Sequence, residues 1–282
     1  MTRRASLMLL ASLLTAAPGA FAEACPAIAG SDELLVAGGV VLLGEMHGTE
    51  ESPALLAGLA CRAAEAGLAV RVGLEVDVAE AAAVESFLGS GGEAPDVERL
   101  LAGPFWTRDY QDGRSSRAMA GLLADLGALR RSGRPVTVFP FSHETAGTDR
   151  DAAMAGTIAG HLTAAGDEAV TLVLTGNLHS RTRVGSPWDP AFEPMGYHLA
   201  TGLPQREIVS LDVCHGGGSA WICTGGSAAD CGERSLGPSR AQGPPGIRLG
   251  SGAEAEGHDG AYCVEALHAS PPARDRNGVG EH

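Results

Sequence analysis

Runs of apolar residues recur along the chain, and several have the length of a buried β-strand. Each run is apolar at almost every position and does not alternate with polar residues. Because strands buried on both faces have this pattern, the runs predict a largely parallel central sheet flanked by helices on both faces. The predicted strands cover residues 39–44, 70–74, 135–139, 169–174 and 207–213, with a final, weaker one at 261–268.

Between these runs, apolar residues return at the three- to four-residue spacing of amphipathic helices. The predicted helices cover residues 51–66, 78–88 and 149–165, together with a long helix that Arg114 opens and Gly133 ends. Glycine is a common residue just past the end of a helix. Strands that alternate with amphipathic helices are typical of an α/β fold.

Two stretches lack a clear periodicity. Residues 95–113 are predicted to be irregular and carry the aromatic residues Phe105, Trp106 and Tyr110. The last third is rich in Gly, Ser and Pro, so residues 233–257 are predicted to form a loop or a disordered insertion. The chain is therefore interpreted as one α/β domain over residues 23–270, followed by a flexible tail at 271–282.

The first 22 residues have the three parts of a secretory signal peptide. Arg3 and Arg4 provide the positive charge, residues 7–14 form an apolar core, and Ala20-Phe21-Ala22 is a small-x-small cleavage sequence. The apolar core is too short to cross a bilayer. We therefore expect an exported protein, periplasmic or secreted, that has no stable membrane anchor.

An even number of cysteines in an exported chain indicates disulfides, although six cysteines allow 15 pairings. Two of them stand apart from the other four, and we expect these two to pair and to tie the N-terminal arm to the first helix. The other four are expected to pair within an irregular, disulfide-stapled C-terminal region. The cysteines are Cys25 and Cys61, then Cys214, Cys223, Cys231 and Cys263.

The chain is strongly acidic. Loss of residues 1–22 removes two arginines and no acids, so the net charge changes from −14 (20 basic, 34 acidic) to −16 (18 basic, 34 acidic). Such a charge repels nucleic acid and anionic lipid, and no nucleic-acid partner is expected. The sequence contains no P-loop, no dinucleotide fingerprint and no GxSxG motif, which disfavours nucleotide enzymes and serine hydrolases. It does not define the oligomeric state.

Carboxylate and imidazole side chains follow the predicted strands. In parallel α/β sheets, ligands bind beyond the carboxyl ends of the strands, so these side chains should meet at one edge. Arg114 is interpreted either as an ion-pair partner of Glu45 or as an ordinary residue at the start of a helix. The predicted site consists of Glu45, His47, Glu75 and His179, with His143 and Asn177 as neighbours.

These residue types suit two kinds of hydrolytic chemistry on a small-molecule or peptide substrate. His47, His179 and Glu45 could bind a divalent metal and leave one position open for water. In the other mechanism, a buried glutamate orients a histidine that takes a proton from water.

Three short motifs resemble the superfamily that joins erythromycin esterases, ChaN-like haem-binding proteins and Tiki proteases. They are the turn at 44–49 (GEMHGT), the strand end Leu74-Glu75 and the turn at 176–179 (GNLH), and the resemblance covers roughly residues 38–213. Resemblance to the Tiki branch implies a metal-dependent peptidase with His47 and His179 as ligands. Resemblance to the esterases implies His47 as a general base supported by Glu45 and Glu75, although the esterase pattern has one more residue between Glu and His.

The Gly-Glu-x-His turn matches the ChaN-like branch best in length, and that branch implies haem binding and a role in iron uptake. A haem protein needs an apolar cleft and an axial ligand, and residues 104–110 are the candidate wall of such a cleft. None of the three tyrosines matches a haem ligand, and no CxxCH motif is present. A secreted binding module with a degenerate site is the third hypothesis.

Overall fold

The computed structural model describes residues 24–144, 149–164, 168–239, 243–250 and 257–274. Its main sheet has seven strands in the order β3-β2-β4-β1-β5-β9-β8. Six strands are parallel, and only β8 runs antiparallel, to its neighbour β9. The bounds of these strands are β1 (Val40–Glu45), β2 (Val70–Asp77), β3 (Val136–Ser142), β4 (Val170–Gly176), β5 (Ile208–His215), β8 (Gly246–Leu249) and β9 (Gly260–Val264).

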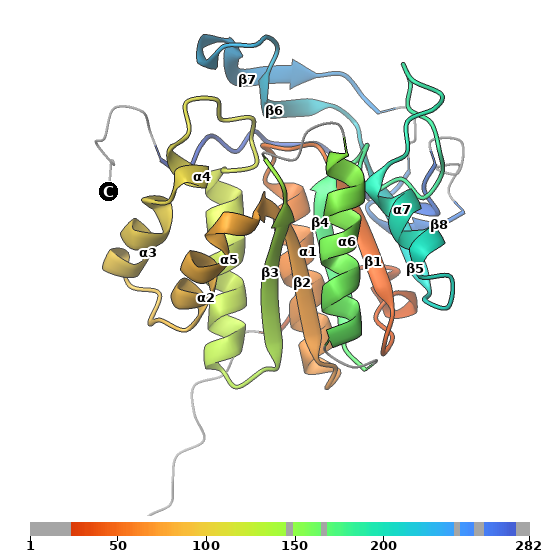
Figure 1. The fold of residues 1–282 in the computed structure, drawn as a ribbon, viewed down its shortest axis with the longest axis horizontal. Helices are drawn as coiled ribbons and strands as arrows, with labels where there is room; N and C mark the ends of the chain where they lie inside the picture. Colours follow the sequence, from red (N-terminus) through yellow and green to blue (C-terminus); the bar gives the residue numbers. More distant parts are fainter. Residues whose placement is uncertain (1–23, 145–148, 165–167, 240–242, 251–256, 275–282) are drawn as a thin grey trace, which may run out of the picture.

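Helices cover both faces of this sheet (Figure 1). Strand β1 shows why, because its side chains alternate between the faces. Val41 and Leu43 belong to a core with α1 and α5, whereas Val40 and Leu42 belong to a second core with α6 and α7. The predicted fold class, a largely parallel sheet between two helical layers, is therefore confirmed. The helices are α1 (Glu51–Glu65), α2 (Ala81–Leu88), α3 (Ala94–Leu101), α4 (Pro104–Thr107), α5 (Arg117–Arg131), α6 (Arg150–Ala164) and α7 (Met195–Gly202).

A separate two-stranded hairpin, β6 (Gly218–Cys223) and β7 (Cys231–Leu236), lies above the carboxyl ends of the sheet strands (Figure 1). Short 3-10 helices complete the structure: η1 (Ser31–Glu33), η2 (Val78–Glu80) and η3 (Ala228–Asp230). The hairpin was not predicted. Its strands are only partly buried, so they lack the continuous apolar run that marks the sheet strands.

Three disulfides are present in the described residues. Cys25–Cys61 ties the N-terminal arm to α1, as predicted. Cys214–Cys263 joins β5 to β9, and Cys223–Cys231 closes the β6–β7 hairpin. The predicted disulfide-stapled C-terminal region is thus confirmed.

Several predicted boundaries were wrong. Residues 95–113 are not wholly irregular, since they contain most of α3 and all of α4, and the 233–257 insertion contains the end of β7 and all of β8. These elements are short and few of their residues are buried, so too few buried apolar positions are available to show a period. Helix α7 was also missed.

The predicted tail begins too early. Residues 271–274 lie on the start of α5, where Pro271 O accepts a hydrogen bond from Arg117 N, and Pro272 is buried. The predicted signal peptide (1–22) and residues 275–282 lie outside the described residues. Among the helices that the structure describes, none is long and apolar enough to span a membrane.

Candidate functional site

The carboxyl ends of β1, β2 and β4 meet at the middle of the sheet. After β1 the chain builds β2 and β3 on one side, and after β4 it crosses to β5, β9 and β8 on the other. The boundary between β4 and β1 is therefore the point at which the strand order reverses, where open α/β sheets place their ligands. Glu45 at the end of β1 lies in register with Gly176 of β4. The structure brings together Glu45, His47, Glu75 and His179 at this point.

His47 lies between two buried carboxylates. Its Nδ1 is 2.9 Å from Glu45 Oε1, and its Nε2 is 3.6 Å from Glu75 Oε2. Burial alone would lower the pKa of His47, but the negative charges of Glu75 and Glu45 outweigh it and raise the pKa above the ordinary value. The ring keeps 22% of its surface exposed, whereas Glu45 and Glu75 keep 3% and 1%. His47 is therefore the member of this trio that solvent reaches.

Glycine at position 176 allows this approach. A Cβ atom there would lie 2.9 Å from His47 Nε2, closer than side chains pack. The GNLH turn thus serves two purposes, since it leaves space for the ring of His47 and carries His179 three residues later.

Glu75 is the centre of the charge cluster. Its Oε2 accepts hydrogen bonds from Thr175 Oγ1 (2.6 Å) and Gly176 N (2.9 Å), and its Oε1 accepts one from Arg150 Nη2 (2.8 Å). Burial opposes ionisation of Glu75, but His47, His179 and the two nearby arginines hold its pKa well below the usual range. Glu75 is therefore a fixed, buried anion.

His179 forms a second histidine–carboxylate pair with Asp151 of α6. The distance from His179 Nδ1 to Asp151 Oδ1 is 2.7 Å, and Asp151 also accepts the backbone N–H of Met195. With a proton on Nδ1, the neutral ring accepts at Nε2 from Arg150 Nη1, 3.2 Å away. Arg150 thus joins His179 to Glu75. The sequence did not point to Arg150 or Asp151, because charged residues at the start of a helix are commonplace.

Arg114 belongs to the cluster, but not as predicted. It precedes α5, whose N-cap is Ser116, and its Nη1 lies 3.6 Å from Glu75 and not beside Glu45. The guanidinium also pairs with Asp112 (2.7 Å) and Glu144 (2.5 Å). Burial opposes the charge of Arg114, but these carboxylates raise its pKa. Its side chain is only 9% exposed, which makes it a structural cation behind Glu75.

Two predicted neighbours point elsewhere. His143 Nε2 is 2.8 Å from Thr157 Oγ1 of α6, and Asn177 Nδ2 donates to Asp212 Oδ1 at 3.3 Å. Among the described residues, no hydrogen bond or ion pair joins either side chain to Glu75 or His47. His143 and Asn177 are therefore not part of the observed charge cluster.

The residues present do not fit a metal ion. Within the described ranges, no group of three His, Cys, Asp or Glu residues is arranged to hold one. The arrangement itself gives the reason, since Arg150 lies between Glu75 and His179 and already supplies the positive charge. The predicted ligand set of His47, His179 and Glu45 is not supported, because Glu45 is directed to His47 Nδ1 and Arg150 to His179 Nε2.

The candidate wall of a haem cleft is part of the core. Phe105 and Trp106 are 3% and 0% exposed and belong to the core cluster that also contains residues of α1 and α5. Tyr110 is more exposed, but its hydroxyl donates to Gly225 O in the β6–β7 hairpin at 3.0 Å. Residues 104–110 therefore do not wall an open cleft.

The fold is similar to that of solved structures, whereas the sequence is not similar to known families. No protein-family model matches the chain, and no curated protein sequence matches it. Erythromycin esterase EreC in its open conformation is 14% identical with a TM-score of 0.64, over 86% of this chain and 94% of that one. A structural-genomics protein from Bacillus cereus is 10% identical with a TM-score of 0.60, over 86% and 92%.

A haem-binding ChaN of Campylobacter jejuni is 11% identical, over 73% of this chain and 89% of that one, with a TM-score of only 0.42. The two structures with TM-scores of 0.64 and 0.60 share the fold of this chain, which is the fold that the predicted resemblance implies. Identities this low do not transfer an activity.

Proposed function

We propose that this chain is an exported hydrolase of ester or peptide bonds that works without a metal, with His47 as the general base. The observation that carries the proposal is the position of His47, a partly exposed imidazole held between the buried carboxylates of Glu45 and Glu75. A carboxylate that binds one ring nitrogen fixes the tautomer and leaves the other nitrogen to take a proton. Three disulfides are in keeping with export.

The residues suggest how the reaction proceeds. Glu45 accepts the Nδ1 proton of neutral His47, so Nε2 removes a proton from a water molecule. The oxygen of that water bonds to the carbonyl carbon of the substrate, and the charge moves to the carbonyl oxygen. Arg150 is a cation in the same cluster with 26% of its side chain exposed, and it is suited to stabilise that oxyanion. Collapse breaks the bond to the leaving group, which takes the proton from His47.

Glu75 supports this cycle electrostatically. It stays ionised and 3.6 Å from His47 Nε2, so it stabilises the imidazolium that forms during the reaction. The same charge attracts Arg150 and Arg114 into the cluster. Similarity of the fold to an esterase supports a carbonyl substrate, and the spacing difference in the Glu-His turn leaves the nature of the ester open.

The test measures hydrolysis of p-nitrophenyl esters and of a fluorogenic peptide library by the oxidised protein. His47→Ala should lower kcat/KM by about 100-fold or more, the usual contribution of a positioned base. His198→Ala is the matched control, because His198 has a similar exposure (26%) and pairs with Glu193 outside the cluster. EDTA should leave the rate unchanged.

Three results would count against the proposal. Hydrolysis that survives His47→Ala would show that another group is the base. If EDTA abolishes the activity and added Zn²⁺ or Mn²⁺ restores it, the metal-dependent mechanism is favoured. A Soret band that appears when haemin is added and disappears in His47→Ala would favour the haem-binding alternative.

A further inference from the structure

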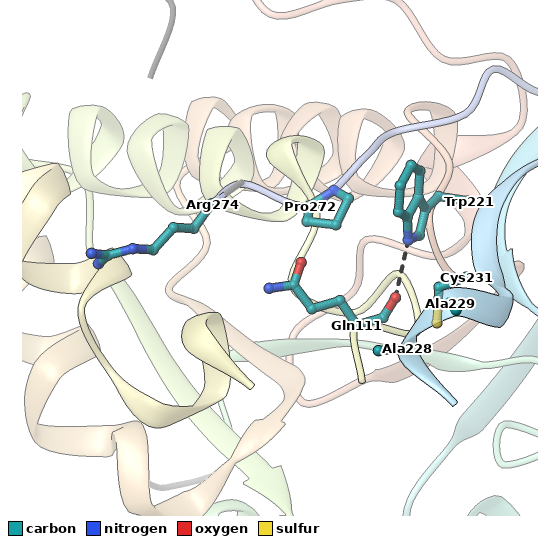
Figure 2. Close-up of a pocket in the computed structure, with 7 residues that line it drawn as sticks. All are labelled: Gln111, Trp221, Ala228, Ala229, Cys231, Pro272 and Arg274. Atoms are coloured by element: carbon teal, nitrogen blue, oxygen red, sulfur yellow. Dashed lines mark hydrogen bonds between the residues drawn. The ribbon is translucent and has the colours of Figure 1, made fainter. Parts of the chain in front are cut away.

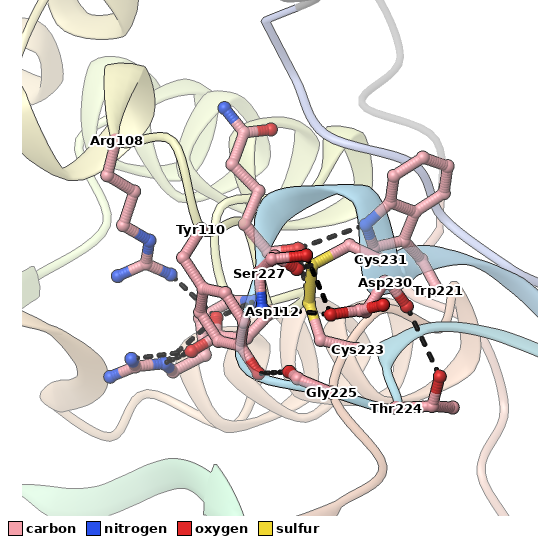
Figure 3. Close-up of a disulfide and its surroundings, with 12 residues drawn as sticks. Arg108, Tyr110, Asp112, Trp221, Cys223, Thr224, Gly225, Ser227, Asp230 and Cys231 are labelled. Atoms are coloured by element: carbon pink, nitrogen blue, oxygen red, sulfur yellow. Dashed lines mark hydrogen bonds and ion pairs between the residues drawn. A yellow bond between two sulfur atoms is a disulfide. The ribbon is translucent and has the colours of Figure 1, made fainter.

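The β6–β7 hairpin lies on two loops that carry residues of the charge cluster. Figure 3 shows the hairpin, closed by Cys223–Cys231, beside the segment that carries Arg108, Tyr110 and Asp112. The Tyr110 hydroxyl donates to Gly225 O at the hairpin tip, at 3.0 Å. Asp112 pairs in turn with Arg108 and Arg114, both at 2.7 Å. The hairpin therefore touches the segment that holds Arg114.

Trp221 of β6 contacts both loops. Its backbone N–H donates to Gly48 O at 2.9 Å, and Gly48 directly follows His47. Its indole Nε1–H donates to Gln111 O at 3.0 Å, and Gln111 directly precedes Asp112 (Figure 2). One side chain with its own backbone thus connects the turn after β1 to the turn before α5.

The loop that contains Gly48 and the loop that contains Gly113 are closely packed against each other. Gly48 has a φ of +73°, and a Cβ atom there would collide with the carbonyl oxygen of Trp221. Gly113 has a φ of +95°, and its Cβ would lie 2.6 Å from Gly48 N. Both positions need glycine for their backbone angles as well as for space. A shift of one loop is therefore transmitted to the other.

We propose that Trp221 is a positioning residue for the reaction, which ties the His47 turn to the Arg114 turn so that both side chains keep their places beside Glu75. The inference rests on the proposed function. A single hydrogen bond from Trp221 would restrain one loop only. Because Trp221 makes one hydrogen bond to each loop, it fixes the distance between the two loops. Among the described residues, no hydrogen bond joins Trp221 to the side chain of Glu75 or His47, so Trp221 acts through the loops.

The Cys223–Cys231 disulfide fixes Trp221 in turn. Cys223 is two residues after Trp221, and Trp221 lies opposite Glu233 in the hairpin register, two residues after Cys231. A cavity of about 330 Å³ lies on one side of Trp221, lined also by Gln111, Pro272 and Arg274 (Figure 2). The residue is therefore held by the indole hydrogen bond to Gln111 O, by the backbone hydrogen bond to Gly48 O and by the hairpin.

The test uses Trp221→Phe, which keeps the backbone bond to Gly48 and an aromatic ring but removes the bond to Gln111 O. We expect kcat for ester hydrolysis to fall about tenfold or more with KM little changed, because misplacement by about an ångström is costly in rate. The NMR signals of the His47 ring should also shift, while the amide signals of β4 stay in place. Trp188→Phe is the control, because Trp188 is 74% exposed in a loop after β4, and it should leave both measurements unchanged.

Tyr110→Phe is the second variant, in case Trp221→Phe does not fold. It removes another hydrogen bond between the hairpin and this segment and should move the same His47 signals by a smaller amount. Unchanged His47 signals and unchanged kcat in a folded Trp221→Phe would overturn the inference. If the native protein hydrolyses no ester or peptide, the proposed function fails, whereas the NMR comparison still decides whether Trp221 positions His47.

Discussion

Single residues in the cluster have unequal roles, and Glu75 has the largest. It is 1% exposed, yet it is ionised and accepts hydrogen bonds from Thr175, Gly176 and Arg150. Because its pKa in the folded protein is lowered, Glu75 contributes stability above pH 4.5 that is lost as the pH falls through the folded pKa. Its charge also neutralises part of the positive charge of Arg114 and Arg150.

Replacing Glu75 by Gln should therefore destabilise the protein as well as inactivate it. The substitution keeps the size but removes the buried anion that faces Arg114 and Arg150, and breaking a buried ion pair in this way costs about 3–5 kcal/mol. Urea unfolding at pH 7 measures the loss. Glu85→Gln is the control, since Glu85 pairs with Arg130 at 2.6 Å but is 58% exposed, and it should cost about 1 kcal/mol or less. Equal losses in the two variants would contradict the central role of Glu75.

The sequence could predict the residues of the cluster that follow strands. These residues lie at or just after the ends of strands: Glu45, His47, Glu75 and His179. A parallel sheet brings the ends of its strands together regardless of the conformation of the loops. Asp112, Glu144, Arg150 and Asp151 come from loops and a helix start, where no periodicity fixes which way a side chain points. Their partners are separated from them by up to 75 residues, as for Arg150 and Glu75, so only the folded chain shows the pairs.

At the level of elements, the same contrast separates the sheet from the hairpin. A strand such as β4 is buried at all seven positions, so its composition alone identifies it. Strands β6 and β7 carry Ser, Gly, Glu and Arg among their apolar residues, and their pairing depends on a disulfide and on contacts with other loops. A strand whose stability depends on contacts with other segments shows only a weak pattern in its own sequence.

The disulfides should differ in what they stabilise. Cys223–Cys231 spans 8 residues and Cys25–Cys61 spans 36, so the chain-entropy model assigns about 2.5 and about 4 kcal/mol to them. Replacing Cys223 and Cys231 by Ala should lower global stability less than replacing Cys25 and Cys61. Hydrogen exchange should nevertheless show faster exchange of β6 amides in the first variant, while β1 and β4 amides remain protected. Loss of protection throughout the sheet would show that the hairpin is part of the global folding unit.

At the level of the whole molecule, the acidic charge and the buried histidine His258 make stability depend on pH. His258 is 1% exposed, and its Nδ1 is 2.8 Å from Ser210 Oγ of β5, while the neighbouring Asp259 accepts Ser210 N. These contacts hold the chain that enters β9 against β5, the strand that borders β1. The C-terminal half of the sheet is therefore attached through a group that is neutral near pH 7.

Burial, with a smaller effect from Arg181, lowers the pKa of His258 from 6.5 to about 4. Between pH 6.5 and about pH 4, His258 is therefore protonated in the unfolded chain but neutral in the folded protein. The free energy of unfolding falls by about 3 kcal/mol across that range. His258→Asn keeps a donor for Ser210 but cannot titrate, so its unfolding free energy should fall less between pH 6.5 and 4, even if it is lower at pH 7. His268→Asn is the control, because His268 is a surface histidine that is 69% exposed. Its unfolding free energy should depend on pH between 6.5 and 4 as that of the native protein does. Chemical denaturation at a series of pH values compares the three proteins. If the unfolding free energy of His258→Asn depends on pH as steeply as that of the native protein, the carboxylates of the charge cluster, and not this histidine, make the protein sensitive to acid.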